Sequence, residues 1–221
     1  MKNKGIIWRD HFIELVIVVI GIYIAFSLNN LDQNRKQRSV KNNYLAQISK
    51  DLAKDSLRLT YSIKYNTIKT KKLERGLELI RSNASVDSVF TYIIEIGNYD
   101  FFTPDNFTLN SMLQSGDFKL IERESTKIEL LRLQKMYEFI DQMQANLLQA
   151  LDENYFPMLL SNMDWTVYRP VVPEFFFGLE IKNYCAFTLN ETSQHIDTYK
   201  RTQKQISKVI QLIDAELNES P

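Results

Sequence analysis

Glu14 is the one charged side chain in the apolar run from Phe12 to Leu28. A carboxylate in such a run contacts a partner helix or binds and transfers ions. Gly21, Ala25 and Asn29 follow it at steps of seven, four and four residues, which keeps all four residues on one stripe of an α-helix. A small residue four positions after another lets two helix backbones approach closely. The stripe therefore predicts helix–helix contact inside a membrane.

Two other interpretations of this stripe stay open. Glu14 lies near one end of the apolar run, so its carboxylate can reach the lipid head groups without touching another protein. The small residues would then be chance, because such spacings are common in apolar segments. The remaining alternative is that Glu14 binds or transfers ions or protons.

Elsewhere the residues used in catalysis and metal binding form no recognisable pattern. His11 and His195 lie far apart, and neither H-E-x-x-H nor C-x-x-C is present, which argues against a standard zinc site. Gly-x-Ser-x-Gly, P-loop and Gly-x-Gly-x-x-Gly patterns are also absent. Cys185 is the only cysteine and is typical of a small buried hydrophobe. We therefore predict a protein that is not an enzyme and holds no cofactor or metal.

A transmembrane helix over residues 12–28 must position the stripe. Seventeen residues at about 1.5 Å each cover roughly 25 Å, which a thin or locally thinned bilayer accommodates. Trp8 precedes the run at the place of an interfacial aromatic anchor. A short basic tail before a long domain is the usual layout of a signal anchor. We therefore predict that residues 1–11 are cytoplasmic and residues 29–221 are extracytoplasmic, although the basic residues on the two sides nearly balance.

A cleaved signal peptide is the competing interpretation of this segment. Lys2, Lys4 and Arg9 form a basic start, and Ala25-Phe26-Ser27 resembles a small-x-small cleavage site. Glu14 inside the apolar run favours an uncleaved anchor, and the helical pattern continues past the cleavage site without a break.

The charges of the chain are segregated although they sum to zero. Residues 32–75 hold twelve Lys and Arg against four Asp and Glu, and residues 76–221 hold twelve against twenty-one. Basic residues next to a membrane helix favour anionic lipid head groups. The candidate head-group contacts are Arg35, Lys36, Arg38 and Lys41. The alternative is that the basic helix pairs with the acidic half of the domain; nucleic-acid binding is not expected.

Beyond the span the sequence predicts an all-α fold, in which the transmembrane helix continues into an elongated antiparallel helical bundle. Ser85 is placed to cap a short helix after the polar break at 82–85. The clearest apolar pattern lies in 130–151, where a seam packs against neighbouring helices. Its members are Leu130, Leu133, Tyr137, Ile140, Gln144, Leu147 and Leu151.

Helix ends are predicted from capping patterns. Thr103-Pro104 predicts a helix start and Gly116 its end. Two Thr-x-x-Glu pairs, from Thr126 and from Thr188, predict two further starts. Residues 155–187 contain three prolines and many aromatics, which predicts a long irregular connection. Its aromatics are interpreted as core packing, with a ligand pocket as the alternative.

Three segments resemble a domain family of unknown function whose members are short membrane-anchored proteins of Bacteroidota. The first is Ile13–Ile22, closing with Ala25 and Asn29-Asn30. The second is Asn43-Tyr44-Leu45 followed by Lys50-Asp51-Leu52, and the third is Thr108–Ile121. The resemblance implies a bacterial inner-membrane setting. It brings no catalytic residue, because the family has no assigned activity.

We therefore expect a non-enzymatic, membrane-anchored interaction or sensor-like module that contacts lipid and associates with itself. The alternative is an accessory single-span subunit of a larger complex, in which Glu14 contacts a multi-span membrane protein. An enzyme of unrecognised type is a third possibility, and it requires a closed pocket with titratable groups among residues 155–187. A small-molecule ligand is not expected.

Overall fold

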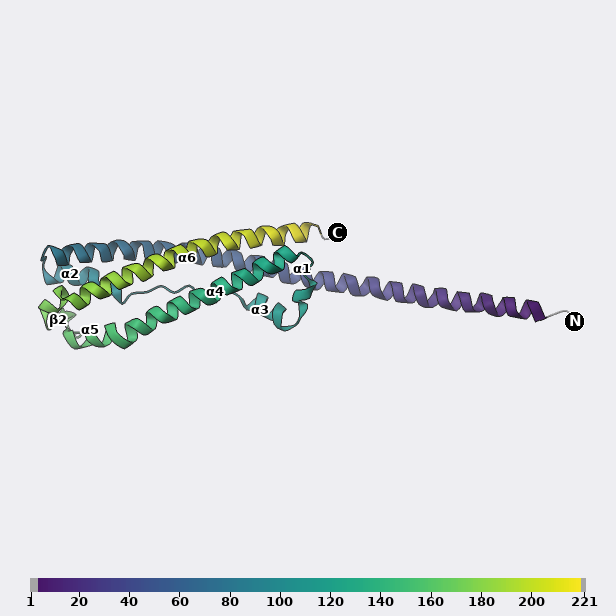
Figure 1. Ribbon diagram of the computed structural model, residues 1–221, viewed down its shortest axis with the longest axis horizontal. Helices are drawn as coiled ribbons and strands as arrows, with labels where there is room; N and C mark the ends of the chain where they lie inside the picture. The colour runs from purple at the N-terminus through teal and green to yellow at the C-terminus, as the bar shows by residue number, and fades with distance from the viewer. Residues whose placement is uncertain (1–3, 220–221) are drawn as a thin grey trace.

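A single helix, α1 (Lys4–Arg81), forms more than a third of the chain. The computed structural model describes residues 4–219, with side chains from His11 to Glu219. Figure 1 shows the first half of α1 projecting beyond every other element, while its second half forms one wall of a bundle. The apolar run thus continues into the bundle without a break, and the all-α prediction is confirmed.

A short helix and an extended segment follow α1. The side chain of Ser85 accepts the backbone N–H of Ser88, which confirms the predicted cap of α2 (Val86–Ile93). Asn83 takes a left-handed conformation at the reversal, with φ of 50°. After the single turn η1 (Ile94–Ile96), residues 97–106 contain no helix.

The next helix, α3 (Phe107–Gln114), begins later than Thr103-Pro104 predicted. Residues 103–105 stay outside the helix, because Arg58 donates to the Thr103 carbonyl and Asp55 accepts the Asp105 N–H. The predicted end is confirmed: Gly116 has φ of 79°, which favours glycine, and leads into η2 (Asp117–Leu120).

The long helix α4 (Glu124–Ala150) continues through a π-helical turn, η3 (Leu151–Tyr155), into α5 (Phe156–Asn162). The capping prediction at Thr126 is wrong, because α4 begins at Glu124. Thr126 is buried inside the first turn, and its hydroxyl has no hydrogen-bond partner among the described residues.

The irregular connection is shorter than predicted. Helix covers 155–162 at one end, and the last helix, α6 (Leu179–Asn218), begins nine residues before Thr188. Thr188 is buried inside α6, on the face that also carries Ile181 and Cys185. Between α5 and α6 the chain forms a two-stranded hairpin and one 3-10 turn. These elements are β1 (Met163–Asp164), β2 (Arg169–Pro170) and η4 (Pro173–Phe177).

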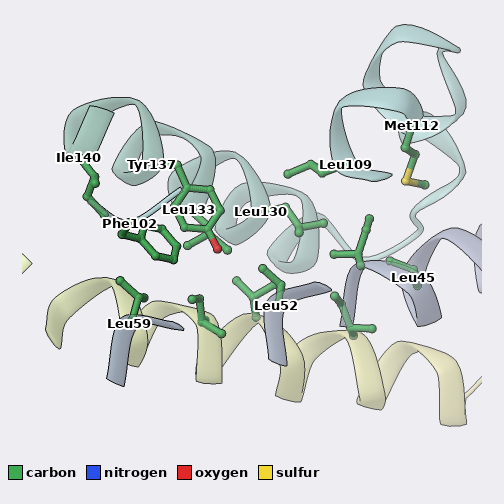
Figure 2. Packing of buried hydrophobic residues seen from close by; sticks show 14 of the residues in the cluster. Leu45, Leu52, Leu59, Phe102, Leu109, Met112, Leu130, Leu133, Tyr137 and Ile140 are labelled. Carbon is green, nitrogen blue, oxygen red and sulfur yellow. The ribbon is translucent and has the colours of Figure 1, made fainter. Parts of the chain in front are cut away.

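The core lies where α1, α4 and α6 run side by side, and the predicted seam of α4 points into it. Figure 2 shows Leu59 of α1 and Ile140 of α4 on either side of Phe102, which comes from the extended segment. A second cluster fills the other end of the bundle around Leu73 and Tyr155. The predicted core packing of the aromatics is confirmed for Tyr155 and Phe176, which are fully buried, but not for Tyr168 and Phe187, which are exposed.

Candidate functional site

The first part of α1, residues 11–40, contains no buried side chain and is called the bare helix. It is the one described helix that is long and apolar enough to cross a membrane, judged by length and composition, and none of its apolar window is buried. All side chains from His11 to Phe26 are exposed. Because burying apolar surface is the main driving force of folding, this helix needs an apolar environment outside the chain.

The stripe of four residues lies on this bare helix, on the side away from the bundle. Lys41 and Leu45, the first buried side chains of α1, each follow a stripe residue by twenty positions. Twenty residues at 3.6 per turn rotate by about 200°, so Gly21 and Ala25 face the opposite side. A Cβ added to Gly21 would meet no atom within 4 Å. The stripe therefore leaves room for a partner helix without touching the bundle.

The flanking residues of the stripe are placed as follows. Glu14 lies 3.6 Å from the Nδ1 of His11 on the preceding turn, and both side chains are exposed. Asn29 is exposed as well. Trp8 belongs to α1, but its side chain lies outside the described residues.

Of the four predicted head-group contacts, the one at Lys41 is wrong. Its side chain is only 2% exposed, and its Nζ lies 2.7 Å from the Oε1 of Glu122. Because the ammonium is buried in the bundle, it cannot reach lipid head groups. Arg35 and Arg38 are exposed, and Lys36 is exposed while pairing with Asp32 at 2.7 Å.

Lys41 is the centre of a polar junction where the bare helix enters the bundle. Glu216 of α6 lies 3.9 Å from the Lys41 Nζ and accepts the backbone N–H of Glu122 at 2.8 Å. The hydrogen bond from Lys41 lowers the pKa of Glu122 below its usual value. Arg123 forms a further ion pair with Glu219 near the end of α6. The junction thus ties α1 to both the start of α4 and the end of α6.

Other basic residues of α1 also pair with acids from later in the chain, as the alternative interpretation of the charges predicted. Lys72 lies 2.5 Å from Glu95, and Lys54 lies 3.6 Å from Asp105. Three lysines of α1 have no carboxylate within 4 Å among the described residues and stay exposed. These are Lys50, Lys64 and Lys71.

Buried polar side chains of α1 and α4 hold the extended segment 97–106 in place. Gln144 accepts the Phe102 N–H at 2.8 Å, donates to the Phe102 carbonyl at 3.1 Å and accepts the Tyr199 hydroxyl at 2.8 Å. Asp55 accepts the Tyr137 hydroxyl at 2.8 Å, and burial raises the pKa of Asp55. Sequence reasoning placed Gln144 in the seam but missed these partners; a polar residue at a seam position was the available signal.

Chemical groups suited to catalysis are not assembled in the part of the chain that the structure describes. No three His, Cys, Asp or Glu side chains are grouped to hold a metal ion there. Two hollows of about 220 and 470 Å³ lie beside the aromatic connection, and Tyr184 lines both. The titratable acids of the larger hollow are Glu153 and Glu180, which are exposed. The absence of enzyme activity therefore stays a prediction.

His195 is a buried titratable group of α6 that lies near Lys69 of α1. Its Nδ1 lies 2.7 Å from the carbonyl of Glu191, and its Nε2 has no hydrogen-bond partner among the described residues. Burial lowers the pKa of His195 below 6.5, and the nearby Lys69 ammonium lowers it further. Lys69 is itself buried, which lowers its pKa to about 8, and it donates to the Asn98 carbonyl at 2.5 Å.

The free energy of unfolding is expected to fall as the pH drops below about 6.5, because only the unfolded chain then protonates residue 195 readily. One proton bound by the unfolded state alone changes stability by about 1.4 kcal/mol per pH unit. Urea unfolding of the full-length protein in detergent between pH 5.5 and 7.5 measures this slope. His195→Leu should flatten the slope, and an unchanged slope would assign it to other groups.

Comparison with known proteins gives one family and no individual relative. No curated protein and no solved structure matches the chain. The model of a family of unknown function, DUF6090, matches residues 14–161. The match begins at Glu14 and therefore includes the stripe, the basic helix and α4, and it ends just before the hairpin. Because it covers well over half of the 221 residues, the chain belongs to the DUF6090 family of unknown function.

Proposed function

We propose that the protein is a non-enzymatic interaction module, anchored in a bacterial inner membrane by residues 12–28. The observation that carries this proposal is the apolar part of α1, no part of which is buried although the helix continues into a packed bundle. The short basic tail favours a cytoplasmic N-terminus, which places the bundle in the periplasm. The resemblance to membrane-anchored proteins of Bacteroidota favours the same setting.

In this proposal the module associates with itself through the stripe of Glu14, Gly21, Ala25 and Asn29. The stripe faces away from the bundle, so two copies can pack their helices while their bundles stay on the outer sides. The apolar run ends at Leu28, and the first buried side chain is Lys41. The intervening helix is about 20 Å long at 1.5 Å per residue. It holds the bundle clear of the head groups while Arg35 and Lys36 lie near them.

A second candidate function is that of an accessory subunit of a larger membrane complex. The exposed Glu14, which faces no part of the bundle, favours it, because a carboxylate in a membrane requires a polar partner. Purification of the full-length chain in mild detergent separates the two functions. A homo-oligomer supports the first, and a stoichiometric multi-span partner supports the second.

Gly21→Leu is expected to abolish most self-association while leaving the protein in the membrane. A Cβ at position 21 meets no atom within 4 Å, so we expect the fold to tolerate the leucine, but the larger side chain separates two helices that pack at Gly21. Membranes are washed with high salt, cross-linked and analysed for oligomers. We expect the dissociation constant of the dimer to rise about tenfold, which corresponds to about 1.4 kcal/mol.

The matched control is Ile22→Leu, which changes the neighbouring position on another side of the helix. Equal dimer yields for wild type and Gly21→Leu would contradict the stripe as an interface. A chain beginning at Leu28 in the salt-washed soluble fraction would contradict the anchor itself.

A further inference from the structure

Exposed large apolar side chains are frequent in the segment that forms the end of the bundle farthest from the bare helix. This end, residues 151–182, is called the distal tip, and Figure 1 shows α5 and β2 there, opposite the N-terminus. Tyr168, Val171 and Leu179 expose 66%, 62% and 71% of their surface. Large exposed apolar patches on a folded protein mark interaction sites. The exposed apolar residues of the distal tip are Leu160, Val167, Tyr168, Val171, Val172 and Leu179.

Two contacts hold the distal tip in place, one within it and one to α2. The Val171 N–H donates to the Asn162 carbonyl at 2.9 Å, which fixes the chain after the hairpin. Phe176 is fully buried and contacts Phe90 of α2 edge to face. A surface that is already ordered loses little conformational entropy on binding.

The hairpin loop carries a bulky residue in a conformation that such residues seldom adopt. Tyr168 has φ of 53° and contacts the ring of Trp165 edge to face. Backbone strain of this kind persists where the surrounding structure enforces it, and it clusters at binding sites. Here it presents the Tyr168 ring to solvent at the outermost turn of the hairpin.

The charges around this patch are mostly negative and are not compensated within the chain. The distal tip holds five acids and two basic residues. None of the five carboxylates has a Lys, Arg or His nitrogen within 4 Å among the described residues. The acids are Asp152, Glu153, Asp164, Glu174 and Glu180, and the basic residues are Arg169 and Lys182.

The negative charge of the distal tip distinguishes between the partners that could bind there. A second copy of the distal tip would bring like charges together, which costs binding energy. An anionic lipid surface would also be repelled. The tip lies near the Arg81 end of α1, about 80 Å along the helix from Leu28 at 1.5 Å per residue, so the anchoring bilayer is out of reach. A positively charged protein surface remains.

We propose that the distal tip binds a protein partner whose contact surface has an apolar centre and a basic rim. The exposed apolar residues of the distal tip fill the centre of the interface, and its carboxylates pair with the partner's Lys and Arg. The bare helix holds this site at a fixed distance from the apolar run. The inference goes beyond the proposed self-association, which uses the opposite end of the molecule.

The experiment places the photo-cross-linker benzoylphenylalanine at Val171 of the full-length chain in its native cells. We expect a covalent adduct with one other protein. Glu174→Lys combined with Glu180→Lys should reduce the adduct about tenfold, because reversing two rim charges opposes a basic partner. The matched charge control is Glu138→Lys with Asp141→Lys, two exposed acids of α4 away from the tip, which should leave the adduct unchanged.

A matched position control places the cross-linker at Leu57, which is 63% exposed on the outer side of α1. The same adduct from Leu57 would overturn the proposal, as would an adduct that survives the charge reversal at the tip. An adduct with a second copy, an adduct with lipid, or no protein adduct would overturn it too. Repeating the experiment with Gly21→Leu keeps the two proposals apart, since loss of the dimer should not affect the Val171 adduct.

Discussion

Gln144→Leu is expected to lower the free energy of unfolding by about 3 kcal/mol, because it removes three buried hydrogen bonds at once. The amide of Gln144 accepts the Phe102 N–H and donates to the Phe102 carbonyl, and it also accepts the Tyr199 hydroxyl. Leucine has a similar size, so little volume changes. The cost arises because the N–H and carbonyl of Phe102 stay buried without partners. Urea unfolding in detergent, followed by circular dichroism, measures the loss.

The matched control is Gln142→Leu, the same substitution two residues earlier on α4. Gln142 is exposed and, among the described residues, bonds only to the exposed Asn146, so we expect a change within about 0.5 kcal/mol. If the two substitutions cost the same, the extended segment 97–106 does not depend on Gln144. Hydrogen exchange at Phe102 adds a local readout, since its amide should lose protection only in Gln144→Leu.

Lys41→Met is expected to lower the free energy of unfolding by about 2–3 kcal/mol. Methionine matches the aliphatic stem of the lysine side chain but lacks the ammonium that lies between Glu122 and Glu216. Glu216 is buried, so its carboxylate would lose a positive neighbour that water cannot replace. The effect stays below that of a fully buried pair, because the Glu122 side chain is 73% exposed. The same urea titration measures it.

Lys36→Met is the control for the junction, one and a half turns earlier on the same helix. Lys36 pairs with Asp32 at 2.7 Å, but both side chains are exposed. Exposed pairs contribute about 0–1 kcal/mol, so a change below about 0.5 kcal/mol is expected. Equal losses for Lys36→Met and Lys41→Met would show that burial does not distinguish the two lysines. Lys36→Met should instead weaken contact with anionic vesicles, which Lys41→Met should leave unchanged.

Local periodicity was sufficient to predict much of the fold. The seam from Leu130 to Leu151 was identified because helical spacing of apolar residues reports directly which face is buried. Ser85 and Gly116 were placed correctly, since a cap and a left-handed glycine act through the few residues beside them. Thr126 and Thr188 were misplaced as caps, because their side chains are buried by distant parts of the chain.

By itself, the sequence determined the helical class, the continuous first helix and the apolar run with its stripe, because spacing along one helix requires no knowledge of what packs against it. Only the tertiary structure decided that Lys41 belongs to the core and that Gln144 holds an extended segment. It also decided that the stripe faces away from the bundle. The physical reason is that burial and hydrogen bonding are set by partners such as Glu216 and Phe102, which lie far away in the chain and become neighbours only on folding.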